Sequence, residues 1–298
     1  MTTDDPAAPR TILPAWLRAM RPKQWVKNVL VFAAPLAAGR LFDLPVLTHV
    51  LWAFVAFCLV SASIYLINDI RDADADRAHP VKRFRPIAAR QLSPRAAGGM
   101  AVVCAVASFA LSWWVAPMLL VVVAVYWLLQ VGYSLWWKRQ PLIDLVMVSA
   151  GFLLRSIAGG VAPGIVLSQW FLLVAAFGSL FMVAGKRYSE LRTLGSQAGT
   201  RPSLERYSDS FLRMVWMVSL AVVIVFYSLW AFEQHNAPLW GVPWAALSII
   251  PFTVALLRYA MTIDAENAGA PEDVVLSDHV LQTLGVAWVI LIAVGVFA

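Results

Sequence analysis

Charged residues are scarce in this sequence. They make up 13% of its 298 residues, whereas hydrophobic residues make up 61%, and the mean hydropathy is +0.73. A soluble domain of this length carries far more charge, so the composition excludes that class and predicts a polytopic membrane protein. The net charge of +6 is compatible with a nucleic-acid partner, but the cations gather at the ends of apolar runs, so we expect no nucleic acid.

Cysteine and histidine are also scarce. The two cysteines, Cys58 and Cys104, each lie inside an apolar run, so we expect buried thiols rather than a disulfide or a metal pair. Among the histidines, His79 alone lies within a polar motif. No early apolar run precedes a small-residue cleavage site, so we expect no cleaved signal peptide.

Apolar runs long enough to cross a bilayer are what the sequence has in abundance. Residues 1–23 predict an N-terminal segment with an interfacial helix around Trp16. Residues 24–298 then form one membrane domain. We expect nine spans, of which the first is interrupted by Lys27, Asn28 and Pro35, at residues 24–42, 46–67, 95–115, 117–136, 142–162, 168–185, 210–232, 243–262 and 279–297.

The orientation follows from lysine and arginine. With nine spans and a cytoplasmic N-terminus, every lysine and arginine except Arg40 and Arg155 falls in the N-terminal segment or at the cytoplasmic end of a span. Cytoplasmic loops carry such an excess, so we expect a multi-pass protein of the plasma (inner) membrane. The acidic loop 264–278 lacks metal-ligand spacing and is interpreted as solvated.

Four carboxylates follow the second apolar run, where residues 68–76 read Asn-Asp-Ile-Arg-Asp-Ala-Asp-Ala-Asp. On a helix, Asp69 and Asp76 lie within about 20° of each other and Asp72 about 60° to one side. Three acids on one stripe repel each other, and Mg²⁺ held by a few carboxylates and substrate phosphates removes that conflict. A solvated, charged cap on a membrane helix is the alternative.

A cationic run follows the acids directly. Pro80 ends the helix, and Lys82, Arg83 and Arg85 fall on a loop that can fold back over a phosphate. Acids followed by cations therefore favour a site for a metal-bound phosphate compound over a solvated cap.

The pattern Asn-Asp-x-x-Asp-x-x-x-Asp at the end of a second membrane helix resembles the UbiA superfamily of intramembrane prenyltransferases. The continuation through His79 and residues 82–87, Lys-Arg-Phe-Arg-Pro-Ile, resembles one branch of it, the decaprenyl-phosphate phosphoribosyltransferases. The resemblance covers essentially the whole chain. It implies an all-α bundle of nine membrane helices around a cavity that is open to the cytoplasm and laterally to lipid.

The resemblance also implies an activity. The chain would transfer 5-phosphoribose from phosphoribosyl diphosphate to a polyprenyl phosphate, such as decaprenyl phosphate, and release diphosphate. The product would be a precursor of the lipid-linked arabinose donor for cell-wall arabinan. Because the lipid phosphate is already an anion, no general base is needed, and catalysis reduces to charge neutralisation and alignment. Whether the protein is a homo-oligomer is left open.

A second aspartate-rich motif, usual in aromatic prenyltransferases of this superfamily, is missing at the end of the sixth span. Residues 185–192 read Gly-Lys-Arg-Tyr-Ser-Glu-Leu-Arg instead. One acidic and one basic cluster suit a substrate with a Mg²⁺-bound diphosphate at one end and a phosphate monoester at the other. An aromatic prenyltransferase of quinone or haem biosynthesis remains an alternative, as does a transporter, although no inverted repeat is evident.

Arg155 lies near the middle of the fifth span, where a cation is costly and indicates function. Asp144 lies on the same face but about 16 Å away, too far to pair with it; a helix N-terminal acid stabilised by the dipole is nearly as good an explanation. Lys23 and Lys27 open the first span, either as topology anchors or, as in the branch, as phosphate contacts.

The hypothesis assigns a role to each candidate. Metal and diphosphate are assigned to Asn68, Asp69, Asp72 and Asp76. The substrate phosphates are assigned to Lys82, Arg83, Arg85, Lys186 and Arg187, and the ribose hydroxyls to Tyr188 and Glu190. Asp69, Asp72, Asp76 and Lys186 are also predicted to be catalytic. Lys23, Lys27 and Arg155 are weaker candidates for phosphate, including the lipid head.

Overall fold

The computed structural model describes residues 13–194, 204–234, 241–265, 274–275 and 277–297. Over these residues the chain is helical and contains no strand, which confirms the all-α class. In this part of the chain, eight helical segments are long and apolar enough to cross a membrane, and the chain is therefore an integral membrane protein.

The eight candidate spans match eight of the nine predicted ones closely. They are α3 (Leu44–Arg71), α5 (Pro94–Val115), α6 (Pro117–Leu135), α7 (Ile143–Val161), α8 (Gln169–Leu194), α9 (Asp209–Phe232), the pair α10 (Trp244–Leu247) and α11 (Ile249–Asp264), and α13 (His279–Phe297). Shorter elements lie between them: α4 (Ala73–Ala78), η2 (Lys82–Phe84), η3 (Trp137–Arg139) and η4 (Leu204–Arg206).

The first predicted span differs from the others. Residues 24–42 do not form one helix: α1 (Ala15–Ala19) is followed by a 3₁₀ helix, η1 (Pro22–Phe32), and by the short α-helix α2 (Ala33–Ala37). Neither is long enough alone to count as a span, so the number nine stays a prediction. Residues 1–12 of the N-terminal segment and most of the loop 264–278 lie outside the described residues.

Local sequence signals explain where several helices begin. The Ser93 hydroxyl accepts a hydrogen bond from the Ala96 amide at 3.2 Å, and Pro94 occupies the first position of α5, as the sequence predicts. Ser208 caps α9 in the same way through the Phe211 amide, also at 3.2 Å. Each cap satisfies an amide that the helix start leaves without an intrahelical partner.

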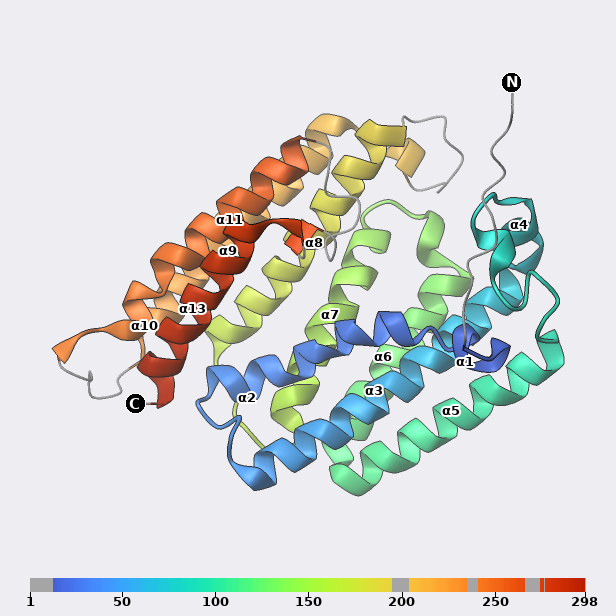
Figure 1. The fold of residues 1–298 in the computed structure, drawn as a ribbon, viewed down its shortest axis with the longest axis horizontal. Coiled ribbons are helices and arrows are strands. Elements are labelled where there is room, and N and C mark those ends of the chain that lie inside the picture. Colours follow the sequence, from blue (N-terminus) through green and yellow to red (C-terminus); the bar gives the residue numbers. More distant parts are fainter. Residues whose placement is uncertain (1–12, 195–203, 235–240, 266–273, 276, 298) are drawn as a thin grey trace.

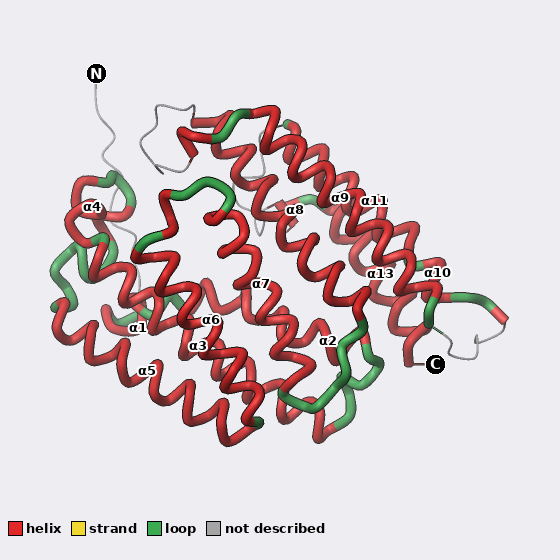
Figure 2. Tube along the Cα trace, turned by 180° about the vertical axis from the view of Figure 1, so that it is seen from behind, coloured by secondary structure: helices red, strands yellow, loops and turns green. Residues whose placement is uncertain are grey.

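The helices form two packed halves that meet at α7. In the N-terminal half α3 packs against α5 and α6, and in the C-terminal half α8 packs against α9, while α7 contacts η1, α6 and α8. One buried cluster gathers around Phe57 and Leu119, and another around Phe181 and Trp216. Figures 1 and 2 show α7 between these halves from both sides.

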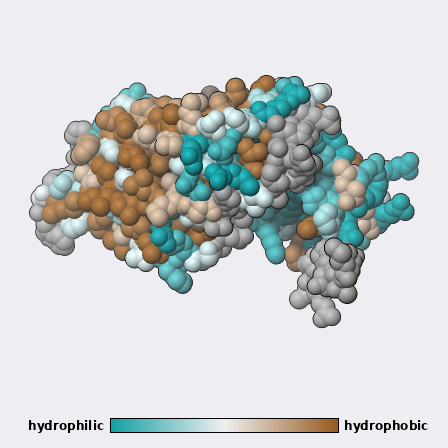
Figure 3. All heavy atoms as spheres, turned by 90° about the horizontal axis from the view of Figure 1, so that it is seen from above, coloured by the Kyte–Doolittle hydropathy of each residue, from teal (hydrophilic) through white to brown (hydrophobic). Residues whose placement is uncertain are grey.

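The polar connections gather at one end of the bundle. In Figure 1, α4, the connection between α6 and α7, and the end of α8 lie along the upper right, whereas α10 and the C-terminal end lie at the lower left. The view in Figure 3 shows hydrophobic atoms over the left part of the molecule and hydrophilic atoms gathered toward the side that carries α4. Polar residues therefore gather at the end of the bundle that carries α4, and the cavity predicted there stays a prediction.

Candidate active site

The acidic motif spans the junction between α3 and α4. Helix α3 ends at Arg71, and Asp72 is the residue at which one helix stops and the next begins, with its amide donating to the Asn68 carbonyl at 2.9 Å. Asp69 and Asp76 are 2% and 4% exposed. A buried carboxylate needs a cation or several hydrogen bonds, so the surroundings of these two side chains define the site.

Arg85 brings Asp69 and Asp76 together. Its Nη1 lies 2.7 Å from Asp76 Oδ2 and 3.3 Å from Asp69 Oδ1. Arg21 forms a second ion pair with Asp69, and its guanidinium carbon lies 5.1 Å from the centroid of the Tyr65 ring. Two carboxylates and two guanidinium groups thus share one part-buried site at the end of α3.

Asp72 lies to one side of this pair. Its Oδ1 is 2.7 Å from Lys138 Nζ of η3, and the two side chains are 27% and 30% exposed. The ion pair therefore connects the α3–α4 junction to the connection between α6 and α7. Asn68, half-buried, lies on the last turn of α3 beside Asp69.

These residues fit a divalent cation. Among the described residues, no group of three or more His, Cys, Asp and Glu side chains is arranged to hold a metal. Asp69 and Asp76 nevertheless meet at one guanidinium, and two carboxylates suffice for Mg²⁺ where substrate phosphates supply further oxygens. Arg21 and Arg85 now balance the charge that a bound cation would neutralise.

The loop that carries the basic run is fixed by its own hydrogen bonds. His79 Nδ1 accepts from the amides of Val81 and Lys82 at 3.1 and 3.3 Å, and Arg77 Nε donates to the Ala88 carbonyl at 3.3 Å. His79 therefore shapes the turn that presents Lys82 and η2 near the acids.

A second polar cluster joins α7 to α8. Arg187 Nε lies 3.3 Å from Asp144 Oδ2, and Arg187 Nη1 lies 3.0 Å from Glu190 Oε2. The side chains of Arg187 and Asp144 are 3% and 0% exposed. Lys186, next to this pair on α8, is half-buried. Arg187 is thus buried in ion pairs whereas its neighbour Lys186 is half-buried, and the phosphate contacts predicted for both stay predictions.

Tyr207 completes the second cluster. Its hydroxyl donates to Asp144 Oδ1 and accepts from the Leu142 amide at 2.6 Å. Burial, and then the hydrogen bond to Asp144, raise the pKa of Tyr207. Leu142 itself has a φ of 64°, a conformation that non-glycine residues rarely adopt. Tyr207 therefore holds a strained turn at the start of α7.

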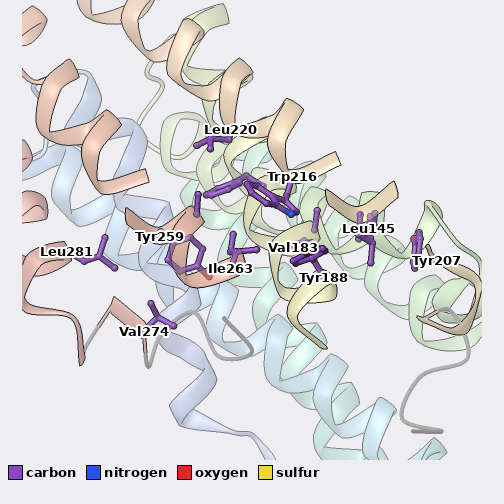
Figure 4. Close-up of a cluster of buried hydrophobic side chains, with 14 residues drawn as sticks. Leu145, Val183, Tyr188, Tyr207, Trp216, Leu220, Tyr259, Ile263, Val274 and Leu281 are labelled. Carbon is purple, nitrogen blue, oxygen red and sulfur yellow. The ribbon is translucent and has the colours of Figure 1, made fainter. Parts of the chain in front are cut away.

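Tyr188 lies in the hydrophobic core, fully buried, with its ring 6.1 Å from the Trp216 ring, centroid to centroid. Figure 4 shows it among the side chains of Val183, Trp216 and Ile263. Its hydroxyl accepts from Arg192 and Arg213 at 3.1 and 3.0 Å. The predicted contact of Tyr188 with a ribose hydroxyl stays a prediction, as does that of Glu190.

Arg155 is 5% exposed and lies among neutral acceptors that include Asn28 and Tyr126. Lys23 is exposed on η1 and Lys27 is half-buried. The phosphate contacts predicted for these three residues stay predictions.

Several members of the two clusters had no role in the sequence hypothesis. In the sequence Arg21 belongs to the cationic run that opens the first span, Lys138 is only a weaker candidate for lining the site at the end of the fourth span, and Tyr207 has no signal. Their roles depend on pairings across 48, 66 and 63 residues of sequence. Helical periodicity within one segment cannot reveal such pairings.

The fold and the site define a polytopic membrane protein with acids and cations at one mouth of a helical bundle. Residues 29–277 match the UbiA prenyltransferase family. This chain belongs to that family.

Curated relatives cover nearly the whole chain. It is 50% identical to a decaprenyl-phosphate phosphoribosyltransferase of Corynebacterium glutamicum over 97% of this chain and 89% of the relative. It is also 50% identical to one of Mycolicibacterium smegmatis, covering 97% and 94%, and 48% identical to one of Mycobacterium tuberculosis, covering 97% and 96%.

Solved structures agree on the fold. A UbiA homologue of Archaeoglobus fulgidus bound to DMAPP and Mg²⁺ has a TM-score of 0.72 at 17% identity, covering 95% of this chain and 99% of that one. The same homologue bound to GPP and Mg²⁺ has a TM-score of 0.71 at 16% identity with the same coverage. These likenesses support the helical architecture.

Proposed function

We propose that this chain transfers 5-phosphoribose from phosphoribosyl diphosphate to a polyprenyl phosphate, with decaprenyl phosphate as acceptor, and releases diphosphate. The observation that carries this proposal is the identity of about half of all residues, over nearly the full chain, to relatives with the corresponding name. The product would be a precursor of the lipid-linked arabinose donor for cell-wall arabinan.

The distribution of charge supports a donor with two separate phosphate groups. The acids lie at α3 and α4, whereas α8 carries Lys186 and Arg187 near its C-terminal end, where Arg187 pairs with Asp144 of α7. In this proposal Asp69 and Asp76, flanked by Asn68 and Asp72, hold Mg²⁺ and the diphosphate. Mg²⁺ supplies neutralisation of the charge on the departing diphosphate.

The remaining phosphates are proposed to meet the cations around the mouth. Arg85, with Lys82 and Arg83 on the same loop, lies beside the acids, and Lys186 is a further half-buried cation near the C-terminal end of α8. When the donor is bound, Arg85 and Arg21 can exchange carboxylate partners for phosphate oxygens, because both are part-exposed, at 27% and 23%. Such charge-assisted contacts orient the donor.

The chemistry requires alignment more than proton transfer. The acceptor phosphate is an anion at neutral pH, so its oxygen can attack ribose C1 as the C1–diphosphate bond breaks. The protein residues hold the two anions in line and offset their mutual repulsion. The end of the bundle with α4 is proposed to face the cytoplasm, with the protein in the inner membrane. The connections that gather at this end carry most of the lysines and arginines of the sequence.

One assay with two substrate pairs tests the proposal. Purified protein receives labelled phosphoribosyl diphosphate with decaprenyl phosphate or, in parallel, a prenyl diphosphate with 4-hydroxybenzoate, each with Mg²⁺ or with chelator. We expect a labelled phosphoribosyl lipid in the first reaction and its loss with chelator. A prenylated aromatic product without phosphoribosyl lipid would instead establish the aromatic prenyltransferase alternative.

A further inference from the structure

The exposure of η1 repeats every three residues. Asn28 and Val31 are fully buried, at 0% exposure, whereas Val26 and Val29 are 60% and 53% exposed, and Lys23 is exposed as well. A 3₁₀ helix has about three residues per turn, so positions three apart share a face. The repeat of buried and exposed positions therefore agrees with the 3₁₀ conformation of this segment.

A 3₁₀ helix of 11 residues is unusually long, because runs beyond about four residues are uncommon. Contacts from outside the segment must therefore hold it. At Gly159 of α7, an added Cβ would lie 1.8 Å from the Val31 carbonyl oxygen, so the two backbones touch. One turn earlier on α7, Arg155 Nε donates to Asn28 Oδ1 at 2.7 Å.

Arg155 reaches acceptors on four elements, counting Asn28 of η1. Its Nη1 donates to the Gly151 carbonyl of α7 at 2.6 Å, and its Nη2 donates to the Tyr126 hydroxyl of α6 at 2.7 Å and the Ser61 hydroxyl of α3 at 3.4 Å. All these acceptors are neutral, and every guanidinium nitrogen is engaged. The planar fork of arginine suits this arrangement, whereas a lysine could not span it.

Asn28 links η1 to both α7 and α3. Its Oδ1 accepts from Arg155, and its Nδ2 donates to Cys58 Sγ of α3 at 3.3 Å. The amide is thus fixed at both ends within a buried environment, where a lost partner is expensive. Fixing Asn28 in this way fixes the rotation of η1 about its axis.

We infer that Arg155 is a positioning residue that locks residues 22–32 in the 3₁₀ register. The register separates Lys23 and Lys27 by about 120° around the axis, whereas an α-helix would place them about 40° apart. Lys27 is consequently half-buried against the bundle while Lys23 points outward. This role goes beyond the proposed function, replaces a direct contact of Arg155 with phosphate, and stands on geometry alone.

A spin-label scan tests the register directly. A nitroxide is attached to one cysteine at a time at positions 23, 24, 26, 27, 29 and 30, in a Cys58→Ser, Cys104→Ser background that keeps an acceptor for Asn28. Collision with oxygen measures exposure in lipid vesicles. We expect the oxygen collision rate to be highest at positions 23, 26 and 29. The ratio of the collision rates at positions 26 and 27 should fall at least about threefold in Arg155→Met, because this variant loses the hydrogen-bond network.

Two further variants keep the test decisive. Arg155→Lys keeps the positive charge but loses the fork, and we expect the three-residue repeat to disappear as it does in Arg155→Met. Asn28→Ala removes the hydrogen bond between Arg155 and η1 but leaves Arg155 its other acceptors. It should weaken the three-residue repeat of the collision rates, and it provides the test if Arg155→Met does not fold. An unchanged repeat in folded Arg155→Met, or in Asn28→Ala, would overturn the inference. The spectra do not depend on activity, so failure of phosphoribosyl transfer in the parent protein would refute the proposed function separately.

Discussion

The two polar clusters of this protein use the same chemical groups in different settings. At α3 and α4, acids at 2% and 5% side-chain exposure pair with arginines at 23% and 27%. Between α7 and α8, Arg187 at 3% pairs with Asp144 at 0%. The part-exposed arginines of the first cluster can exchange a carboxylate for water or, as proposed, for a phosphate, whereas Arg187 of the second cannot move without leaving a buried charge unpaired.

This contrast assigns different tasks to the two halves. An exchangeable ion pair suits a site that must accept and release anions and a divalent cation. The buried Arg187–Asp144 ion pair, to which the Tyr207 hydroxyl donates a hydrogen bond, fixes how α7 and α8 pack against each other. The substrate-binding role predicted for Arg187 thus rests on weaker structural ground than that of its neighbour Lys186, and substitutions in the two clusters should differ in what they change.

The largest expected effect is on catalysis at the first cluster. Asp76→Asn keeps the size of the side chain but removes a charge proposed to hold metal and diphosphate, and we expect kcat to fall about 10²–10³-fold or more, the usual scale for losing one electrostatic contact to a transition state. Turnover of labelled phosphoribosyl diphosphate at saturating Mg²⁺ measures it.

Asp74→Asn is the matched control for that experiment. Asp74 lies on the same short helix, but its side chain is 96% exposed and pairs with Arg77 on the surface, so its removal should leave turnover within about twofold, in line with the small worth of exposed pairs. If Asp76→Asn and Asp74→Asn lost turnover equally, the acidic motif would be a solvated, charged helix end rather than a site for metal and diphosphate.

The second cluster should respond in stability. Arg187→Ala leaves Asp144 and Glu190 without this partner inside the protein, and breaking a buried pair in this way costs about 3–5 kcal/mol. Thermal unfolding of the purified protein in detergent, measured once in phosphate buffer and once in a phosphate-free buffer, reports this loss of stability. If Arg187→Ala unfolds like the parent protein but requires far more donor, this cluster binds substrate after all.

Much of this architecture can be predicted from the sequence, because apolar length and composition determine spans, and Ser93 with Pro94 determines a helix start. The spacing of Asp69 and Asp76 predicts that they share one side of a single helix; the structure breaks that helix at Asp72, yet the two acids still meet at one guanidinium across the α3–α4 junction. The register of η1 could not be predicted, since it depends on Arg155 and Gly159, more than 120 residues further along the chain. Neither could the identity of the pairs, because any of several cations at the mouth could have reached Asp72.

A smaller effect separates Lys186 from Arg187. Lys186→Ala should raise the KM for phosphoribosyl diphosphate by roughly ten- to 150-fold, the equivalent of about 1.5–3 kcal/mol for a charge-assisted contact. Unfolding temperature and the KM for the lipid phosphate should change little, since Lys186 is half-buried. Initial rates at varied donor concentration check this. An unchanged donor KM would reduce Lys186 to a topology anchor.

The smallest expected effect concerns the hydroxyl of Tyr207. Tyr207→Phe removes a donor to Asp144 and an acceptor from the Leu142 amide, and leaving these groups unsatisfied costs about 1–3 kcal/mol of stability. Because burial and the bond to Asp144 raise the pKa of Tyr207 in the folded protein, its stabilisation is fully present below the pKa of the unfolded chain, about 10. It is lost as the pH rises beyond that value toward the folded pKa.

Unfolding measured between pH 7 and pH 11 tests both parts of this prediction. The parent protein should lose stability above pH 10 more steeply than Tyr207→Phe, so that the difference between the two narrows as the pH rises. Phe211 stacks on the Tyr207 ring at 6.0 Å between centroids, and this contact survives in Tyr207→Phe, which isolates the hydroxyl. Parallel curves of stability against pH for the two proteins would show that the Tyr207 hydroxyl does not hold the strained turn at Leu142. The contact between α7 and α8 in the second cluster would then depend on the Arg187–Asp144 pair.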